Sequence, residues 1–164
     1  WTLKAMTDSL GSKEFVQDFV GGLAGSLVNL LPAVVFLIGC VIAFATGTSW
    51  GTFGILIPIV VSVFSNDKEM MVIAMSACMA GAVCGDHCSP ISDTTIMASA
   101  GAQSNHINHV NTQLPYAMTV AAVSFVAYVI AGFVKNVFIA LPVAFAMMVA
   151  VLAVLVKVYG KESE

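Results

Sequence analysis

This sequence carries few charged residues. Charged residues make up 9% of the 164 positions, and since arginine is absent, all six basic residues are lysines. A soluble globular domain carries about 25% charged residues, whereas 59% of this chain is hydrophobic and its mean hydropathy is +0.97. The lack of arginine and a net charge of −3 argue against a nucleic-acid partner. The composition predicts an all-α, multi-pass protein of the cell membrane, in contact with the lipid bilayer.

Cysteine is also sparse, and its placement excludes two classes of site. The four cysteines are Cys40, Cys78, Cys84 and Cys88, and all lie in apolar or motif sequence rather than in loops. They therefore do not form the pattern of a secreted disulfide framework. Cys84, His87 and Cys88 are close together, but a structural zinc site normally has four ligands. Because no fourth ligand is evident, we expect packed cysteines and no transition metal.

Apolar runs long enough to span a bilayer are few, because a spanning helix takes about 20 residues. The runs before residue 103 are shorter and come in pairs, each pair separated by a polar stretch. Each pair predicts either one discontinuous helix or a re-entrant hairpin, buried in protein or lining a water-filled cavity. The expected elements are an amphipathic interfacial helix at 14–31, interrupted segments at 32–64 and 70–102, and spanning helices at 114–134 and 137–156.

The polar stretch Gly85–Thr95 is the most informative part of the chain. Asp86 and Asp93 are the only Asp, Glu, Lys or Arg residues between Glu69 and Lys135. A carboxylate at bilayer depth costs roughly 2.5–3.5 kcal/mol on insertion scales, so it is usually functional, paired or in contact with water. Since no basic residue lies nearby in sequence, a bound cation or proton is expected to balance these acids.

Interrupted apolar segments mark the binding sites of many transporters. A helix that stops at Ala45 or Cys84 leaves carbonyl oxygens with partial negative charge, and oxygen donors suit hard cations such as Na⁺. Asp86 follows such an end, where an anion needs neutralising, so we predict that it exchanges Na⁺ for H⁺. The other predicted ion ligands carry carboxylate or hydroxyl oxygens: Asp93, Ser89, Ser92, Thr94, Thr46, Thr48 and Ser49.

Asp93 and His87 each have two possible roles. Asp93 opens a new helical stretch with Ser92, so it is equally expected to cap that helix, alone or while binding the ion. His87 lies between candidate ligands, and because unperturbed imidazole titrates near pH ~6.5, it is either a proton relay or a structural histidine.

Three stretches, Thr46–Ile55, Gly85–Ile96 and His109–Ala117, resemble the C-terminal region of the NhaC-type Na⁺/H⁺ antiporters of the ion-transporter superfamily. The similarity covers roughly residues 15–135. The resemblance implies secondary active exchange of Na⁺ against H⁺, with the transported ions in place of any cofactor. Relatives also exchange these ions against malate and lactate, so a small organic acid is the alternative substrate. The implied fold has inverted repeats whose hairpins or broken helices meet near the membrane midplane.

Members of that family are longer chains, and this one resembles only their later part. We therefore expect it to need the missing transporter half, or a homo-oligomer, to complete its site. An intramembrane aspartyl protease would also place two acids in the membrane, but its Gly-x-Gly-Asp pattern has Val83 at the first glycine here. A non-transporting membrane scaffold is the remaining alternative.

Overall fold

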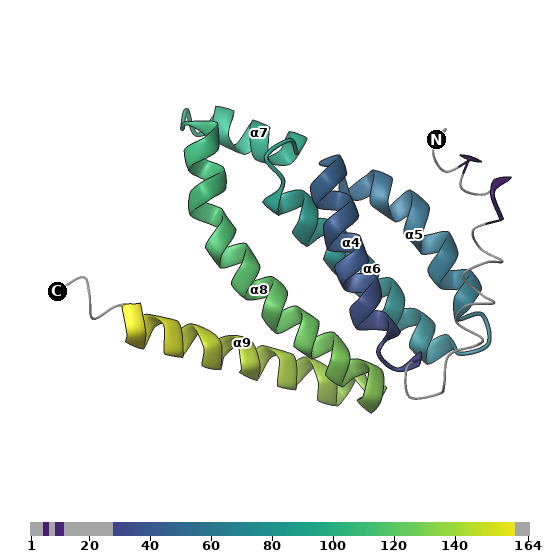
Figure 1. The fold of residues 1–164 in the computed structure, drawn as a ribbon. Helices are drawn as coiled ribbons and strands as arrows, with labels where there is room; N and C mark the ends of the chain where they lie inside the picture. Colours follow the sequence, from purple (N-terminus) through teal and green to yellow (C-terminus); the bar gives the residue numbers. More distant parts are fainter. Residues whose placement is uncertain (1–4, 7–8, 12–27, 160–164) are drawn as a thin grey trace.

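The chain folds into helices throughout the part that the structure describes. The computed structural model describes residues 5–6, 9–11 and 28–159, and its ordered elements are all helical, without a strand among these residues (Figure 1). This confirms the all-α prediction. The helices are α4 (Leu31–Thr46), α5 (Ser49–Val63), α6 (Lys68–Cys88), α7 (Asp93–Gly101), α8 (His106–Val134) and α9 (Val137–Tyr159). Most of the helix predicted at 14–31 lies outside the described residues.

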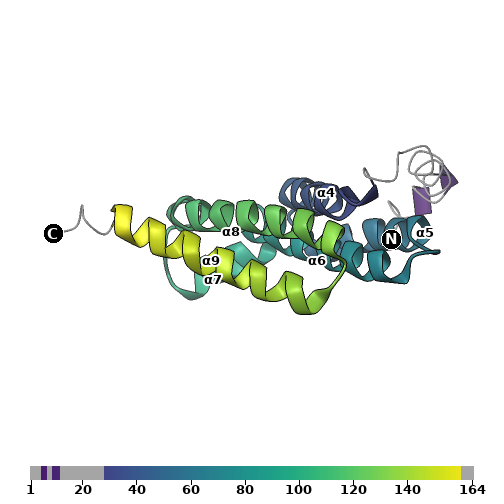
Figure 2. The same cartoon turned by 90° about the horizontal axis from the view of Figure 1, so that it is seen from below.

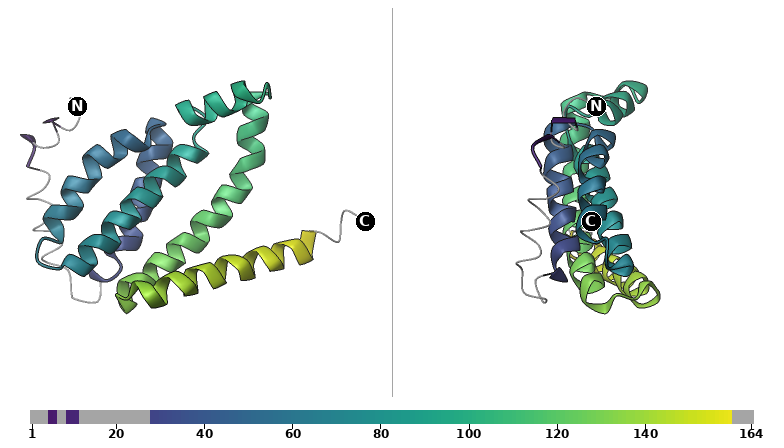
Figure 3. Two further views of the ribbon diagram at one scale, coloured as in Figure 1. Left: turned by 180° about the vertical axis from the view of Figure 1, so that it is seen from behind. Right: turned by 90° about the vertical axis from the view of Figure 1, so that its right-hand side faces the viewer.

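The first interrupted segment is a helical hairpin. Gly47 ends α4 with a left-handed φ of +65°, which glycine adopts without steric cost. Thr48 then caps α5 by accepting a hydrogen bond from the Gly51 amide. Figures 1 and 3 show that α5 reverses direction at the end of α4 and runs beside α6. Of the two alternatives from the sequence, a hairpin or a discontinuous helix, the structure forms the hairpin.

The second interrupted segment changes direction at residues 89–92. Asp67 caps the start of α6, whose last residue is Cys88. Pro90 lies in the turn that follows, and α7 then crosses the end of the bundle (Figure 1). A proline there disfavours helical backbone at the residue before it, so α6 and α7 are separate helices.

Glycines let α4 and α6 pack backbone against backbone. A Cβ added at Gly81 would collide with the carbonyl of Phe36, and one at Gly85 would collide with the carbonyl of Cys40. From the other side, a Cβ at Gly39 would stand 3.1 Å from the Ala82 nitrogen. Small residues spaced four apart are a common means of close helix approach in membranes. The pair α4 and α6 is accordingly the most extensive helix contact in the described fold.

The longest helix, α8, is held against this pair by Tyr128. The Tyr128 hydroxyl is 3.0 Å from the Ser76 hydroxyl on α6, and its ring lies 5.5 Å from that of Phe36 on α4. The helix starts at His106, earlier than the 114–134 prediction, because Asn105 accepts a hydrogen bond from the Asn108 amide and caps it. Figures 1 and 2 show α9 starting where α8 ends and diverging from it, away from the bundle.

Three helices are long and apolar enough to cross a membrane: α6, α8 and residues Val137–Val158 of α9. Their burial differs, since half of the most apolar window of α6 is buried and none of that of α9 is. The hairpin helices α4 and α5 are shorter, at 16 and 15 residues. The described chain is thus a multi-pass membrane protein built around α6.

Adding a methyl group at the α4–α6 contact should destabilise the fold. We expect Gly81→Ala and Gly85→Ala to cost about 1–3 kcal/mol, the usual range for overpacking. Gly54→Ala is the matched control, because a Cβ there meets nothing within 4 Å. Thermal unfolding in detergent, followed by circular dichroism, measures the effect. Equal midpoints for Gly85→Ala and Gly54→Ala would contradict the close contact.

A pH dependence is expected at the capping residue of α6. The Met70 amide donates to Asp67 at 3.0 Å, and Lys135 lies 3.3 Å away, so together they lower the pKa of Asp67 below its ordinary value of 3.8. A lowered pKa means that this stabilisation is present above the ordinary value and is lost as pH falls through the folded one.

Asp67→Asn keeps a capping side chain but has no charge at any pH. Its unfolding midpoint should therefore lie below that of the wild type near neutral pH, with the gap closing below pH ~4. An equal gap across a pH series of unfolding curves would show that the charge of Asp67 contributes nothing.

Candidate ion-binding site

The two breaks predicted from sequence lie against each other. The Ser89 hydroxyl, after α6, donates to the Phe44 carbonyl in the last turn of α4 at 2.8 Å. At the α4 end itself, a Cβ on Gly47 would stand 2.9 Å from the Ile91 carbonyl oxygen. Gly47 thus meets two demands, a left-handed φ and close approach of the other break. The site is built where these two non-helical stretches cross.

The segment between α6 and α7 is a tight turn built on Ser89. The Ser89 amide donates to the Asp86 carbonyl at 3.0 Å, and the Ser89 carbonyl accepts from the Ser92 amide at 3.3 Å. Both serine side chains are fully buried. Their hydroxyls are therefore fixed inside the fold, beside the end of α6.

Several helix-end carbonyls, predicted as cation ligands, already have protein donors. Ser89 supplies one for Phe44. The His87 carbonyl accepts from the Thr95 hydroxyl at 3.4 Å and from the side-chain amide of Gln113. Since these donors come from the break, α7 and α8, the carbonyls they satisfy have less capacity for a cation.

Asp86 is the exception to this satisfied network. Its side chain is only 5% exposed, and its Oδ1 is buried with no hydrogen-bond partner in the described structure. The sequence predicted a helix end at Cys84 with Asp86 after it, but α6 continues to Cys88. Asp86 therefore lies in the last turn of α6, where the helix dipole disfavours negative charge. Burying an ionised carboxylate without a partner is costly. These three conditions make Asp86 the candidate ion-binding acid of the described chain.

The other predicted ligands are divided between the interior and the surface. Besides Asp86, only Ser89 and Ser92 are buried. Thr48 and Ser49 are half-buried at the start of α5, while Thr46, His87, Asp93 and Thr94 are exposed.

The outer residues bond to near neighbours. Thr46 donates to the Ile42 carbonyl at 2.8 Å, Thr94 lies 2.7 Å from the Ser92 hydroxyl, and the Thr94 amide donates to Asp93 at 2.8 Å. Ser92 is the residue that precedes α7, and Asp93 is its first. The structure therefore brings Asp86, Ser89 and Ser92 inside and leaves the rest at the margin.

Sequence reasoning missed the residues that hold the break in place. His106, the first residue of α8, has Nε2 2.7 Å from the Pro90 carbonyl and Nδ1 3.0 Å from the Ser99 hydroxyl. Gln113 reaches the His87 carbonyl from the same helix. His106 and Gln113 are seven residues apart, and residues at this spacing lie on one face of a helix. That spacing could have indicated a helix, but the polar composition of residues 103–113 indicates a loop.

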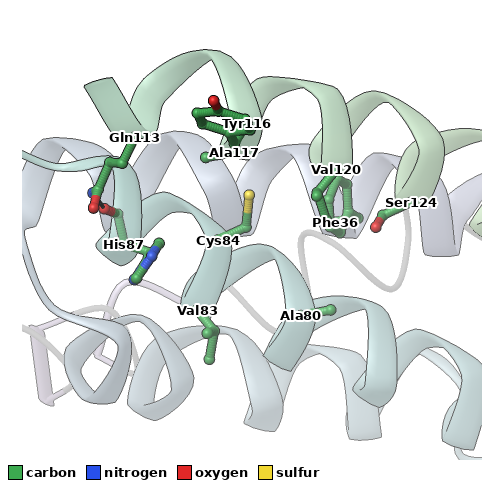
Figure 4. A pocket seen from close by; sticks show the side chains of 10 residues that line it. All are labelled: Phe36, Ala80, Val83, Cys84, His87, Gln113, Tyr116, Ala117, Val120 and Ser124. Carbon is green, nitrogen blue, oxygen red and sulfur yellow. Dashed lines mark hydrogen bonds between the residues drawn. The ribbon is translucent and has the colours of Figure 1, made fainter. Parts of the chain in front are cut away.

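A cavity of about 610 Å³ is lined by residues of α4, α6 and α8, and it shares His87 and Gln113 with this network. Figure 4 shows polar side chains at its two ends, His87 and Gln113 at one and Ser124 at the other, with an apolar middle. Its lining is Phe36, Ala80, Val83, Cys84, His87, Gln113, Tyr116, Ala117, Val120 and Ser124. Asp86 is not among these residues, so the cavity and the buried carboxylate are separate features.

No group of three His, Cys, Asp or Glu side chains stands close enough to hold a metal ion in the part of the chain that the structure describes.

A polytopic helical membrane protein with paired helix breaks and a buried acid has the architecture of a secondary transporter. The model of the Na⁺/H⁺ antiporter family matches residues 1–133. The chain belongs to this family, which confirms the resemblance found in the sequence and favours a transporter over a protease.

Individual relatives agree with this assignment. Over 134 residues the chain is 47% identical to an uncharacterized protein of Haemophilus influenzae, covering 81% of this chain and 25% of the relative. It is 30% identical over 111 residues to an uncharacterized Na⁺/H⁺ antiporter of the same organism, covering 68% and 24%. A malate-2H⁺/Na⁺-lactate antiporter of Bacillus subtilis is 28% identical over 97 residues, covering 59% and 21%. The chain thus spans about a quarter of the length of these relatives. No solved structure matches it.

Removing the His106 side chain should loosen the break. His106→Ala leaves the Pro90 carbonyl without its donor, a loss worth about 1 kcal/mol for a typical hydrogen bond. We expect the amides of residues 91–96 to exchange with deuterated solvent several-fold faster. His109→Ala, on the same helix, is the matched control. If these amides exchange at the same rate in both variants, the His106 side chain does not hold the break.

Proposed function

We propose that this chain carries the shared Na⁺ and H⁺ site of a secondary active antiporter, with Asp86 as its exchanging carboxylate. The observation that carries this proposal is the buried Asp86 oxygen that lacks a partner at the C-terminal end of α6. Family membership supports the class of reaction. We propose no cofactor besides the transported ions.

The exchange is competition at one carboxylate. Either Na⁺ or a proton neutralises Asp86, and binding of one displaces the other, so each conformational cycle carries a single kind of ion in each direction. The buried hydroxyls of Ser89 and Ser92 can supply further oxygens, because a hydroxyl that donates one hydrogen bond keeps lone pairs for a cation.

The outer residues can coordinate the ion only if another part of the protein shields them from solvent. Thr46, Thr48, Ser49, Asp93 and Thr94 are exposed or half-buried. We propose that the rest of the transporter, or a second copy of the chain, covers them and completes the cation coordination. His87, exposed and lining the cavity, is the proposed proton relay between solvent and the region of Asp86.

The cavity favours a second candidate, exchange of a small organic acid against the same ions. Its 610 Å³ volume is in the range of small-molecule sites, which combine apolar walls with a few polar groups. One relative is named as a malate and lactate antiporter. In this case the organic acid would bind beside His87 and Gln113, while Asp86 would still bind the coupling ion.

The test follows proton movement in proteoliposomes on addition of Na⁺, using the protein expressed in the full length of its reading frame. Asp86→Asn should abolish Na⁺-driven proton movement, because the amide cannot take up a proton in exchange for Na⁺. Glu69→Gln, which neutralises an exposed acid at the other end of the same helix, should leave it unchanged. Ser92→Ala should raise the Na⁺ concentration needed for half-maximal flux.

The outcomes separate the candidates. Full exchange in Asp86→Asn would contradict the proposal, and loss in Asp93→Asn alone would transfer the role to Asp93. Flux that appears only when malate or lactate is added would establish the organic-acid exchanger.

A further inference from the structure

Three of the four free cysteines gather where α4 and α6 touch. The side chain of Cys84 interacts with that of Cys40 on α4 and with that of Cys88 one turn further along α6. The two backbones are as close here as glycine allows, since the Cα of Cys40 lies 2.9 Å from where a Cβ of Gly85 would stand. Neither the ion site nor the hydrogen-bond network described above uses these thiols.

The cluster is reachable from the cavity. Cys84 is half-buried and lies in the cavity wall, between the polar end at His87 and the apolar middle (Figure 4). Cys40 is also half-buried. Cys78, by contrast, is fully buried on the same helix and does not line the cavity. A small reagent can therefore meet Cys84 before it meets Cys78.

Geometry selects which pair can join. Cys84 and Cys88 are four apart on one helix, where Cβ atoms are about 5–6 Å apart, whereas a disulfide holds them at about 3.5–4.5 Å. Cys40 and Cys84 are on different helices whose backbones touch at the neighbouring Gly85. The spacing within a single helix therefore does not hold the interhelix pair apart.

We propose that Cys40 and Cys84 form an oxidation site, at which a small hydroperoxide converts their thiols into a disulfide that joins α4 to α6. One thiol is first oxidised to a sulfenic acid, as hydrogen peroxide loses its O–O bond and releases water. The second thiol attacks this sulfur and expels a second water. Two thiols and one hydrogen peroxide thus give one disulfide and two waters.

The bridge would act on the region around the breaks. Gly85 and Asp86 directly follow Cys84, and Cys40 lies in α4 ahead of Phe44, whose carbonyl accepts from Ser89. A covalent link at this level fixes the two helices that carry both breaks. The oxidation site itself rests on geometry and stands whether or not Asp86 exchanges ions.

Cleavage at methionine provides a direct test on the full-length protein. Cyanogen bromide separates this chain into fragments 7–70 with Cys40, 76–79 with Cys78, and 80–97 with Cys84 and Cys88. After mild treatment of the folded protein with hydrogen peroxide, mass spectrometry should find fragments 7–70 and 80–97 joined, with loss of two hydrogen atoms. Fragment 76–79 should keep its free thiol.

Serine variants identify the sulfurs. Cys40→Ser and Cys84→Ser should abolish the joined species, whereas Cys88→Ser and the control Cys78→Ser should retain it. Dithiothreitol should separate the fragments again. The proposal would be overturned if the loss of two hydrogen atoms were confined to fragment 80–97, or if the joined species persisted in Cys84→Ser. It would also be overturned if the fragments stayed unjoined under conditions that oxidise every thiol of the unfolded protein.

Discussion

The rest of the structure depends on the contact between the backbones of α4 and α6. Gly39, Gly81 and Gly85 remove the side chains that would separate the two helices. Because the helices touch along this line, their ends come together, and Ser89 can reach the Phe44 carbonyl. Larger residues at these glycines would move the breaks apart. The packing of α4 against α6 therefore determines where the candidate ion-binding residues meet.

Hydrogen bonding around the breaks makes Asp86 stand out. Side chains from the break, α7 and α8 satisfy the Phe44, Pro90 and His87 carbonyls. These carbonyl oxygens around the breaks all accept hydrogen bonds from side chains, yet Oδ1 of the buried Asp86 carboxylate has no partner. Unsatisfied buried groups in native proteins call for a specific explanation. The exchanged ion that we propose for Asp86 would provide one.

The sequence was informative about chemistry and less so about geometry. Composition predicted the all-helical membrane fold, and the shortness of the apolar runs predicted both breaks. The sequence does not distinguish a hairpin from a discontinuous helix at Gly47, since a left-handed glycine can end a helix in either arrangement. The start of α8 was missed because Asn105 caps a helix whose first turns are polar. Long-range partners such as His106 with Pro90 depend on how α7 folds back, which no local pattern encodes.

Difference infrared spectroscopy can detect proton release from Asp86, because it distinguishes a protonated carboxylic acid from a carboxylate. Na⁺ would be added to the full-length protein at constant pH, at the lowest pH at which it stays folded. If Asp86 exchanges a proton for Na⁺, a protonated-acid band falls while carboxylate bands rise, and this change is lost in Asp86→Asn but kept in Glu69→Gln. An unchanged difference spectrum in Asp86→Asn would show that Asp86 is not the exchanging carboxylate.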